Sequence, residues 1–230
     1  MSESVIVGPV NVRDVGGLPL DGGGQTSFGV LLRGDALYDG DGPPTGVSWP
    51  PAAVIDLRSD KERARSPYRW PASTTFVARQ LFDAADLAQM TRRDSLVSVY
   101  RDMVTHSGPA IASLLDLMPD DGATYIHCAA GKDRTGASIA ALLLLAGVPV
   151  EAVVADYQAT NANIDGVLTR LFARGAMSAD WDPTWAETPL EAITLIIDEI
   201  TSHSQGARGW FLHHGAAEDT IERYQERMRS

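Results

Sequence analysis

The segment from residue 124 to residue 146 constrains the fold of this chain most strongly. It begins with a short apolar run, continues through a loop that contains Gly131, and ends in a long apolar run with helical spacing. A strand that feeds into a helix is the unit from which α/β domains are built, because the helix can pack back across the sheet. The segment therefore predicts an α/β fold.

Extended and helical signals alternate along the rest of the chain. Strands are expected at 28–33, 53–57, 74–81 and 123–128. Helices are expected at 109–118, 135–146, 150–160, 162–174, 189–203 and 217–229. This order indicates a central sheet, mixed or parallel, flanked by helices, with a helical C-terminal half. Loops are expected at 35–51 and 178–189, and no linker or repeat divides the chain, so we expect residues 1–230 to form a single domain.

Composition excludes several classes of protein. A net charge of -11 argues against sequence-independent binding to nucleic acid or to an anionic membrane, because both depend on Lys and Arg neutralising phosphates. No run reaches the roughly 18 apolar residues of a membrane span, and no signal-peptide pattern opens the chain. We therefore expect a cytoplasmic protein without stable membrane insertion, although leaderless export leaves no mark in a sequence. The sequence carries no signal of oligomeric state.

The only cysteine, Cys128, begins the loop that contains Gly131. A single thiol excludes an intramolecular disulfide and a multi-cysteine zinc site. A loop that leads into a helix points several backbone N–H groups at one spot, where an anion or a thiolate is stabilised. Arg134 would present two parallel donors to phosphoryl oxygens, which a lysine ammonium cannot do. These features indicate a phosphate cradle with a thiolate in it; the alternative is a buried structural cysteine, the commoner fate of a lone Cys.

The motif HCAAGKDRTG at 127–136 resembles the signature of the protein tyrosine phosphatase superfamily, in particular of bacterial tyrosine and serine phosphatases related to the mycobacterial protein tyrosine phosphatase B. Further segments are similar to motifs of that family: NVRDVGG at 11–17, LRGDAL at 32–37, VIDLR at 54–58 and VADY at 154–157. The resemblance implies a single α/β phosphatase domain. It also implies hydrolysis of phosphomonoesters through a phosphocysteine intermediate, with no cofactor and no metal ion.

The resemblance gives roles to the residues of the loop. Cys128 corresponds to the nucleophile, Arg134 to the phosphate clamp that also stabilises the transition state, and Thr135 to a residue that assists breakdown of the phosphoenzyme. Phosphate, or vanadate in its place, is expected to bind to the backbone N–H groups of Ala129, Ala130, Gly131, Lys132, Asp133 and Arg134.

Other residues are expected to support the loop without reacting. The side chain of His127 should point to the face of the strand opposite to the nucleophile, because side chains alternate in an extended segment. Arg13 and Asp14 are expected to form an ion pair that braces the loop. Arg33 and Arg58 are also expected to form ion pairs, with a place in the pocket as the alternative.

The general acid has two candidates. The tryptophan-proline-aspartate loop that supplies it in many tyrosine phosphatases is absent upstream of Cys128. Asp133 lies beside Arg134, where related bacterial enzymes also have an aspartate, and Asp83 follows an expected strand, as another family candidate does. We favour Asp133. The structural alternatives are a loop-orienting carboxylate for Asp133 and a helix N-cap for Asp83.

Several functions fit these motifs. The first is hydrolysis of phosphotyrosine in a phosphoprotein or phosphopeptide, extended to phosphoserine and phosphothreonine in a dual-specificity enzyme. The second is hydrolysis of a phosphoinositide, because Lys132 adds a second cation to the loop. Two less favoured alternatives are a sulfurtransferase, which also has a loop cysteine at a helix N-terminus, and a phosphate-binding module without catalysis.

Overall fold

The chain folds around a five-stranded sheet, seen in a computed structural model that describes residues 8–81, 95–177 and 183–229. The sheet order is β1-β2-β5-β3-β4; β1 is antiparallel to β2 and the other neighbours are parallel. The expected α/β fold with a mixed sheet is therefore confirmed. The strands are β1 (Arg13–Asp14), β2 (Leu31–Gly34), β3 (Ala53–Asp56), β4 (Thr75–Ala78) and β5 (Thr124–His127).

The middle of the sheet determines where a site can form. Every residue of β2, β3 and β5 is buried, as expected for apolar strands covered on both faces, whereas the edge strand β4 is largely exposed. In register, Gly34 and Asp56 both lie beside His127, so the three strands end together. The loops that follow parallel strands meet at this carboxyl edge, where α/β proteins usually bind ligands.

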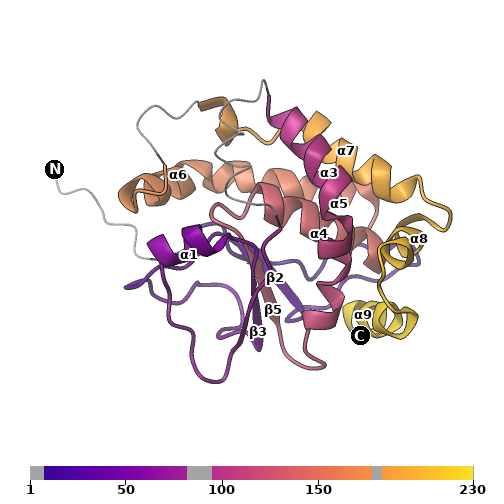
Figure 1. Ribbon diagram of the computed structural model, residues 1–230. Helices are drawn as coiled ribbons and strands as arrows, with labels where there is room; N and C mark the ends of the chain where they lie inside the picture. The colour runs from indigo at the N-terminus through magenta and orange to yellow at the C-terminus, as the bar shows by residue number, and fades with distance from the viewer. Residues whose placement is uncertain (1–7, 82–94, 178–182, 230) are drawn as a thin grey trace.

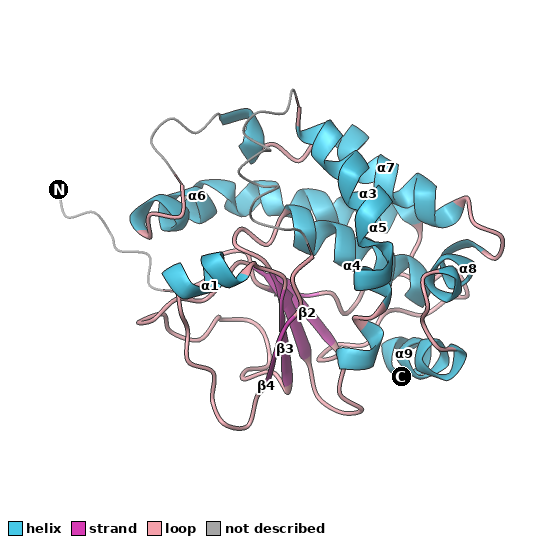
Figure 2. Cartoon of the chain, in the orientation of Figure 1, coloured by secondary structure: helices cyan, strands magenta, loops and turns pink. Residues whose placement is uncertain are grey.

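Helices α3 to α9 gather on one side of the strands, and α1 lies at the strands' upper ends (Figure 1). Figure 2 shows how strongly the second half of the chain is helical, as expected. No helix among the described residues has the length and apolar character needed to cross a membrane. The helices are α1 (Asp60–Arg65), α3 (Leu96–Ala112), α4 (Asp133–Ala146), α5 (Val150–Gln158), α6 (Ile164–Ala173), α7 (Leu190–Thr201), α8 (Gly206–His213) and α9 (Glu218–Arg229).

Helix α4 is the core of the helical layer. It contacts β5 on one side and α5, α7, α8 and α9 on others, and nearly all of its residues are buried. A helix that is apolar all round is stable only in such surroundings. It ends at Gly147, whose left-handed φ of 90° lets the chain turn away at once. The packing of α4 therefore fixes the position of its N-terminus, where the loop from β5 arrives.

The expected helix at 109–118 is wrong in its position. The helix begins at Leu96, and Pro109 lies in its last turns, followed by a short 3₁₀ turn at Leu115–Leu117. Proline suits the first turn of a helix best, which is why the sequence indicates a start at Pro109, but α3 accommodates Pro109 in its last turn without the hydrogen bond from its nitrogen. The short helices α1 and α8 were not expected. Of the loop expected at 178–189, residues 183–186 form a 3₁₀ turn (Pro183–Ala186), and residues 178–182 lie outside the described part.

We expect Leu142→Ala to destabilise the protein strongly. Leu142 lies in the middle of α4 with 0% of its surface exposed, so truncation leaves a cavity and should lower the free energy of unfolding by about 2–5 kcal/mol. Leu190→Ala is the matched control, because Leu190 is 52% exposed, and its effect should stay within about 0.5 kcal/mol. Urea unfolding of the two variants measures the difference, and equal losses would contradict the central role of α4.

Candidate active site

The loop between β5 and α4 begins with Cys128, which is 3% exposed. The helix that follows starts at Asp133, and no side chain caps its N-terminus. The first N–H groups of an uncapped helix have no partner within the helix, and the helix dipole adds positive potential there. The sequence thus brings a thiol and several unpaired backbone donors to one place, as expected.

The carbonyl groups of the loop all point away from this place. The carbonyl oxygens of residues 129, 130 and 131 accept hydrogen bonds from the backbone of Ala36 (3.1 Å), the amide of Asn11 (3.2 Å) and the guanidinium of Arg33 (2.9 Å), in that order. In a trans peptide the N–H points opposite to the C=O of the same plane. Binding of the carbonyls from behind therefore directs the following N–H groups toward the cavity.

Two glycines allow the loop to lie this close to the sheet. Gly131 has a left-handed φ of 69°, and a Cβ built on it would lie 2.3 Å from the carbonyl carbon of Gly34. No larger residue fits at Gly131 without moving the backbone of β2. The contact brings the donors of the N-terminal segment within reach of the loop.

Buried charges hold two of those donors in place. Arg33 is fully buried and forms an ion pair with Asp156 of α5, which also binds Nε of Arg13 at 2.8 Å. Arg13 in turn donates to Asn11 Oδ1 at 3.0 Å and so orients its amide toward the loop. The expected ion pair of Arg33 is confirmed, with a partner that the sequence did not indicate.

The expected ion pair between Arg13 and Asp14 is wrong. Asp14 accepts hydrogen bonds from the backbone N–H groups of Gly16 (2.8 Å) and Gly29 (2.7 Å) instead. Neighbours in a strand point to opposite sides, so the two side chains cannot meet. Arg13 contributes to the support of the loop through Asp156, whereas Asp14 closes the turn that leads into β2.

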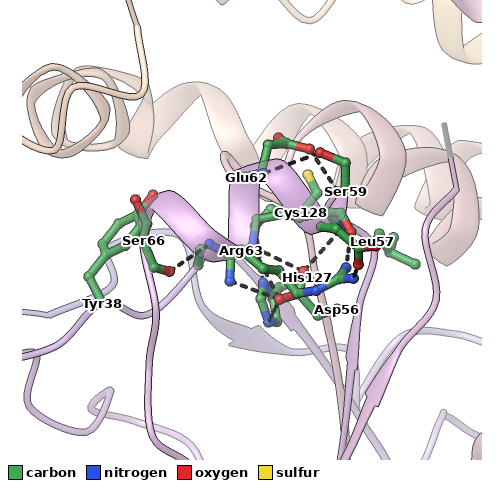
Figure 3. Close-up of polar contacts among 12 residues, drawn as sticks. Tyr38, Asp56, Leu57, Ser59, Glu62, Arg63, Ser66, His127 and Cys128 are labelled. Atoms are coloured by element: carbon green, nitrogen blue, oxygen red, sulfur yellow. Dashed lines mark hydrogen bonds and ion pairs between the residues drawn. The ribbon is translucent and has the colours of Figure 1, made fainter. Parts of the chain in front are cut away.

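Arg134 lies at the first turn of α4 and is held by Glu62 of α1, a residue that sequence analysis missed. Its Nη1 and Nη2 donate to the two carboxylate oxygens of Glu62 at 2.8 and 2.7 Å, and Nη1 also reaches Leu57 O at 3.3 Å. Glu62 closes the capping box of α1 with Ser59 (Figure 3). The spacing of Ser59 and Glu62 is typical of a capping box and could have predicted the start of α1. It carries no information about the contact between Glu62 and Arg134.

Glu62 and Arg134 each change the pKa of the other. Burial alone would raise the pKa of Glu62, but the hydrogen bonds and charge of Arg134 outweigh burial and lower it to about 2. Burial would lower the pKa of Arg134, and the same hydrogen bonds raise it further above its ordinary value. Both groups are therefore charged across the whole physiological range, and the guanidinium has a fixed orientation.

Asp133 is held by two donors on one oxygen. Its Oδ1 accepts from the hydroxyl of Tyr100 at 2.9 Å and from Nζ of Lys132 at 2.7 Å. Lys132 is only 3% exposed and also donates to the carbonyl of Glu187 at 2.9 Å. The other candidate acid, Asp83, lies outside the described residues.

Thr135 and His127 are both buried. The hydroxyl of Thr135, in the first turn of α4, has no hydrogen-bond partner among the described residues. The ring of His127 lies on the face of β5 opposite to the thiol, as expected, and its Nδ1 is 3.1 Å from the carbonyl oxygen of Cys128. Arg58 is paired with Asp56, and both line a cavity together with His127.

A cavity of about 180 Å³ lies over the loop. Apolar side chains from α3 and α6 form its walls, together with Trp185 of the 3₁₀ turn. Among the described residues, no three His, Cys, Asp or Glu side chains form a group that could bind a metal ion. The floor of the cavity is lined by six of the eight residues expected in the loop, without Gly131 and Thr135: Cys128, Ala129, Ala130, Lys132, Asp133 and Arg134.

We expect the Glu62–Arg134 pair to make stability depend on pH. The pKa of Glu62 is about 2 in the folded chain, below its ordinary value of 4.5, so the stabilisation is complete above pH 4.5 and is lost as the pH falls toward 2. The shift corresponds to about 3 kcal/mol at most. Glu62→Gln mimics the protonated carboxyl group. The free energy of unfolding of the wild-type protein should therefore be higher than that of the variant at pH 7, and the two values should converge at low pH.

Urea unfolding of both proteins between pH 7 and pH 2.5 measures this difference. The control is Glu226→Gln, which removes an exposed carboxylate of α9 and should show a small gap without that pH dependence. A gap for Glu62→Gln that stays constant over the whole range would show that the pair contributes nothing as an ion pair.

Comparisons with known proteins agree with this geometry. The chain is 34% identical over 120 residues to a tyrosine-protein phosphatase of Nostoc commune, which covers 49% of this chain and 41% of the relative. It is 30% identical over 168 residues to a putative tyrosine-protein phosphatase of Cupriavidus necator, covering 66% and 60%. It is 28% identical over 125 residues to the triple specificity protein phosphatase PtpB of Mycobacterium tuberculosis, covering 54% and 43%.

The matches to these relatives are partial, and the chain spans less than two thirds of the length of each. A family model covers much more of the chain: the one described as the tyrosine phosphatase family matches residues 5–230. That range includes every strand of the sheet, the loop with Cys128 and all the helices. The chain belongs to the tyrosine phosphatase family.

Proposed function

We propose that this chain hydrolyses phosphomonoesters, with phosphotyrosine as the preferred substrate and Cys128 as the nucleophile. The observation that supports this most is that three successive carbonyls of the loop accept hydrogen bonds from the N-terminal part of the chain, since a trans peptide then directs the N–H groups that follow to the opposite side. Such an array suits the oxygens of a phosphate dianion. A buried structural cysteine would need neither these bonds nor Arg134 beside it.

Arg134 keeps donors for a phosphate while it binds Glu62. A guanidinium has five N–H donors along two usable edges. Glu62 takes the edge formed by Nη1 and Nη2, and the edge that includes Nε remains for two phosphoryl oxygens. Glu62 is thus proposed as a positioning residue that sets the guanidinium plane and does not compete with the substrate. The fixed charge stabilises the transition state most, because negative charge there spreads over the equatorial oxygens.

The proposed reaction has two steps. In the first, Sγ of Cys128 forms a bond to phosphorus while the bond to the phenolic oxygen breaks, and a general acid donates a proton to that oxygen. In the second, the oxygen of a water molecule bonds to phosphorus and its proton passes to the carboxylate of that acid, while the S–P bond breaks and releases phosphate and the thiolate. The hydroxyl of Thr135 has no other hydrogen-bond partner among the described residues, which supports a role in binding the departing thiolate. Asp133 remains the favoured acid: its Oδ1 accepts both hydrogen bonds, so Oδ2 would carry the proton.

The walls of the cavity favour an aromatic ester. Leu96, Val99, Ile164 and Trp185 would contact the phenyl ring of a phosphotyrosine, whereas the short arm of phosphoserine would leave these side chains exposed to water. Hydrolysis of phosphoinositides is less favoured, because Lys132, the second cation of the loop, is already bound by Asp133 and by the backbone. The name of the mycobacterial relative, a triple specificity protein phosphatase, is nevertheless a reason to test more than one class of substrate.

The test of this function is Cys128→Ser. The variant should lose turnover of para-nitrophenyl phosphate by several orders of magnitude, because a serine hydroxyl without a general base is a poor nucleophile. Binding of inorganic phosphate should persist, since the N–H groups and Arg134 remain, and a phosphate titration followed by NMR measures it. Wild-type turnover in the variant would exclude the proposed nucleophile. A parallel phosphate-release panel of phosphotyrosyl, phosphoseryl and phosphoinositide substrates measures the preference.

The general acid can be identified from a leaving-group series. A phenol with a low pKa leaves as its anion, whereas a poor leaving group needs a proton as the P–O bond breaks. Asp133→Asn should therefore slow alkyl and phosphotyrosyl substrates far more than activated aryl phosphates, and should remove the basic limb of the pH profile for turnover.

Asp83→Asn is the comparison variant and should have the smaller effect. If Asp83→Asn instead shows the steeper dependence on leaving-group pKa, and Asp133→Asn a uniform loss for all substrates, the acid is Asp83. Asp133 would then serve to link the loop to Tyr100 and Lys132.

A further inference from the structure

A second cavity, of about 360 Å³, lies behind the loop, on the face of the sheet opposite to the thiol. Its polar floor comes from the ends of β3 and β5, where Asp56 and His127 lie side by side. Its walls come from α1 and from the segment between α1 and β4, with Tyr68, Trp70 and the exposed Phe76. In Figure 3 the side chains of Asp56 and His127 lie below Glu62 and the sulfur of Cys128.

Two hydrogen-bond acceptors face each other in the floor of this cavity. The carbonyl oxygen of Cys128 can only accept, so the Nδ1 of His127 next to it must donate. Burial lowers the pKa of His127, so the ring is neutral and its Nε2 carries a lone pair. Nε2 has no partner among the described residues, and it lies 3.8 Å from Oδ2 of Asp56. A buried acceptor without a donor is unfavourable, because it has lost its hydrogen bonds to water and gained none in return.

A single amino group can satisfy both acceptors. An –NH₂ group has two N–H donors that diverge from one nitrogen, so it can direct one to Nε2 and the other to Oδ2, which are 3.8 Å apart. Oδ2 already accepts from Nη2 of Arg58 at 2.8 Å, but a carboxylate oxygen accepts more than one hydrogen bond. An amine attached to a flat ring would match the aromatic walls.

The charges of the floor indicate a neutral ligand. Asp56 is paired with Arg58 through hydrogen bonds of 2.8 to 3.2 Å, so the two cancel. Arg63, at the rim, donates to the carbonyl of Arg58 and to Asp60. No uncompensated carboxylate among the described residues of this cavity is available to bind an ammonium group. Tyr68 and Trp70, with ring centroids 4.8 Å apart, offer an apolar wall for a second ring.

We propose that this rear cavity is a binding site for a flat, neutral aromatic amine, held by the acceptor pair of His127 and Asp56 and by the rings of Trp70 and Phe76. The ligand would stabilise the tautomer of His127 that donates to the Cys128 carbonyl. The site therefore has a direct connection to the signature loop, although binding there does not require that the chain be catalytic.

Adenine is a suitable probe because it is a flat ring with one exocyclic amino group, and 6-dimethylaminopurine is the same ring without the two exocyclic N–H donors. Adenine should bind with saturable changes in the NMR signals of the His127 ring and of the Trp70 indole. The dimethyl compound should bind at least about tenfold more weakly, because both acceptors then stay unpaired. No saturable binding of adenine, or equal binding of the two compounds, would overturn the proposal.

Protein variants locate the site. Phe76→Ala should weaken adenine binding roughly three- to tenfold, because it removes one aromatic contact from a side chain that is 44% exposed and so adds little to folding. Leu190→Ala, which removes an exposed side chain elsewhere, should leave the affinity unchanged. Unchanged affinity in Phe76→Ala would place the adenine outside this cavity and refute the assignment.

Discussion

The orientation of the peptide planes between β5 and α4 is the constraint on which the rest of the site depends. A loop of this length could direct its carbonyls inward as easily as outward, and only the outward arrangement binds an anion. The donors that select it are Asn11, Arg33 and Ala36, all from the first part of the chain. The contact between Gly34 and Gly131 lets these donors reach the loop. The N-terminal segment is thus as much a part of the site as the signature motif.

Local pairing of charges explains how a chain with a net charge of -11 can present an anion site. Arg58 is balanced by Asp56 and Arg134 by Glu62, whereas Arg13 and Arg33 share the single carboxylate of Asp156, so this cluster behind the loop keeps a net positive charge. The affinity for a dianion then comes from this local charge, the backbone N–H groups, the helix N-terminus and the remaining edge of Arg134. These act over short distances, and the charge of the distant surface is largely screened at physiological salt.

Much of this could be predicted from the sequence, because the information was local. The strand, loop and helix around Cys128 could be predicted from the pattern of neighbouring residues. The face of the strand on which the His127 side chain lies could be predicted from the alternation of side chains in a strand. The partners of the arginines could not be predicted in this way: Glu62 is 72 positions from Arg134, and Asp156 is 123 positions from Arg33. Pairing Arg13 with its neighbour Asp14 failed for the same reason, since it assumed a local partner where the fold supplied a distant one.

Two short elements connect the front and rear cavities. At the end of β5, alternation puts His127, the last residue of the strand, behind and Cys128, the next residue, in front, and the imidazole donates a hydrogen bond to the Cys128 carbonyl. Along α1, Glu62 binds Arg134 while its neighbour Arg63 lines the rear cavity. The nucleophile and the partner of the arginine are therefore held by the same two elements that form one side of the rear cavity.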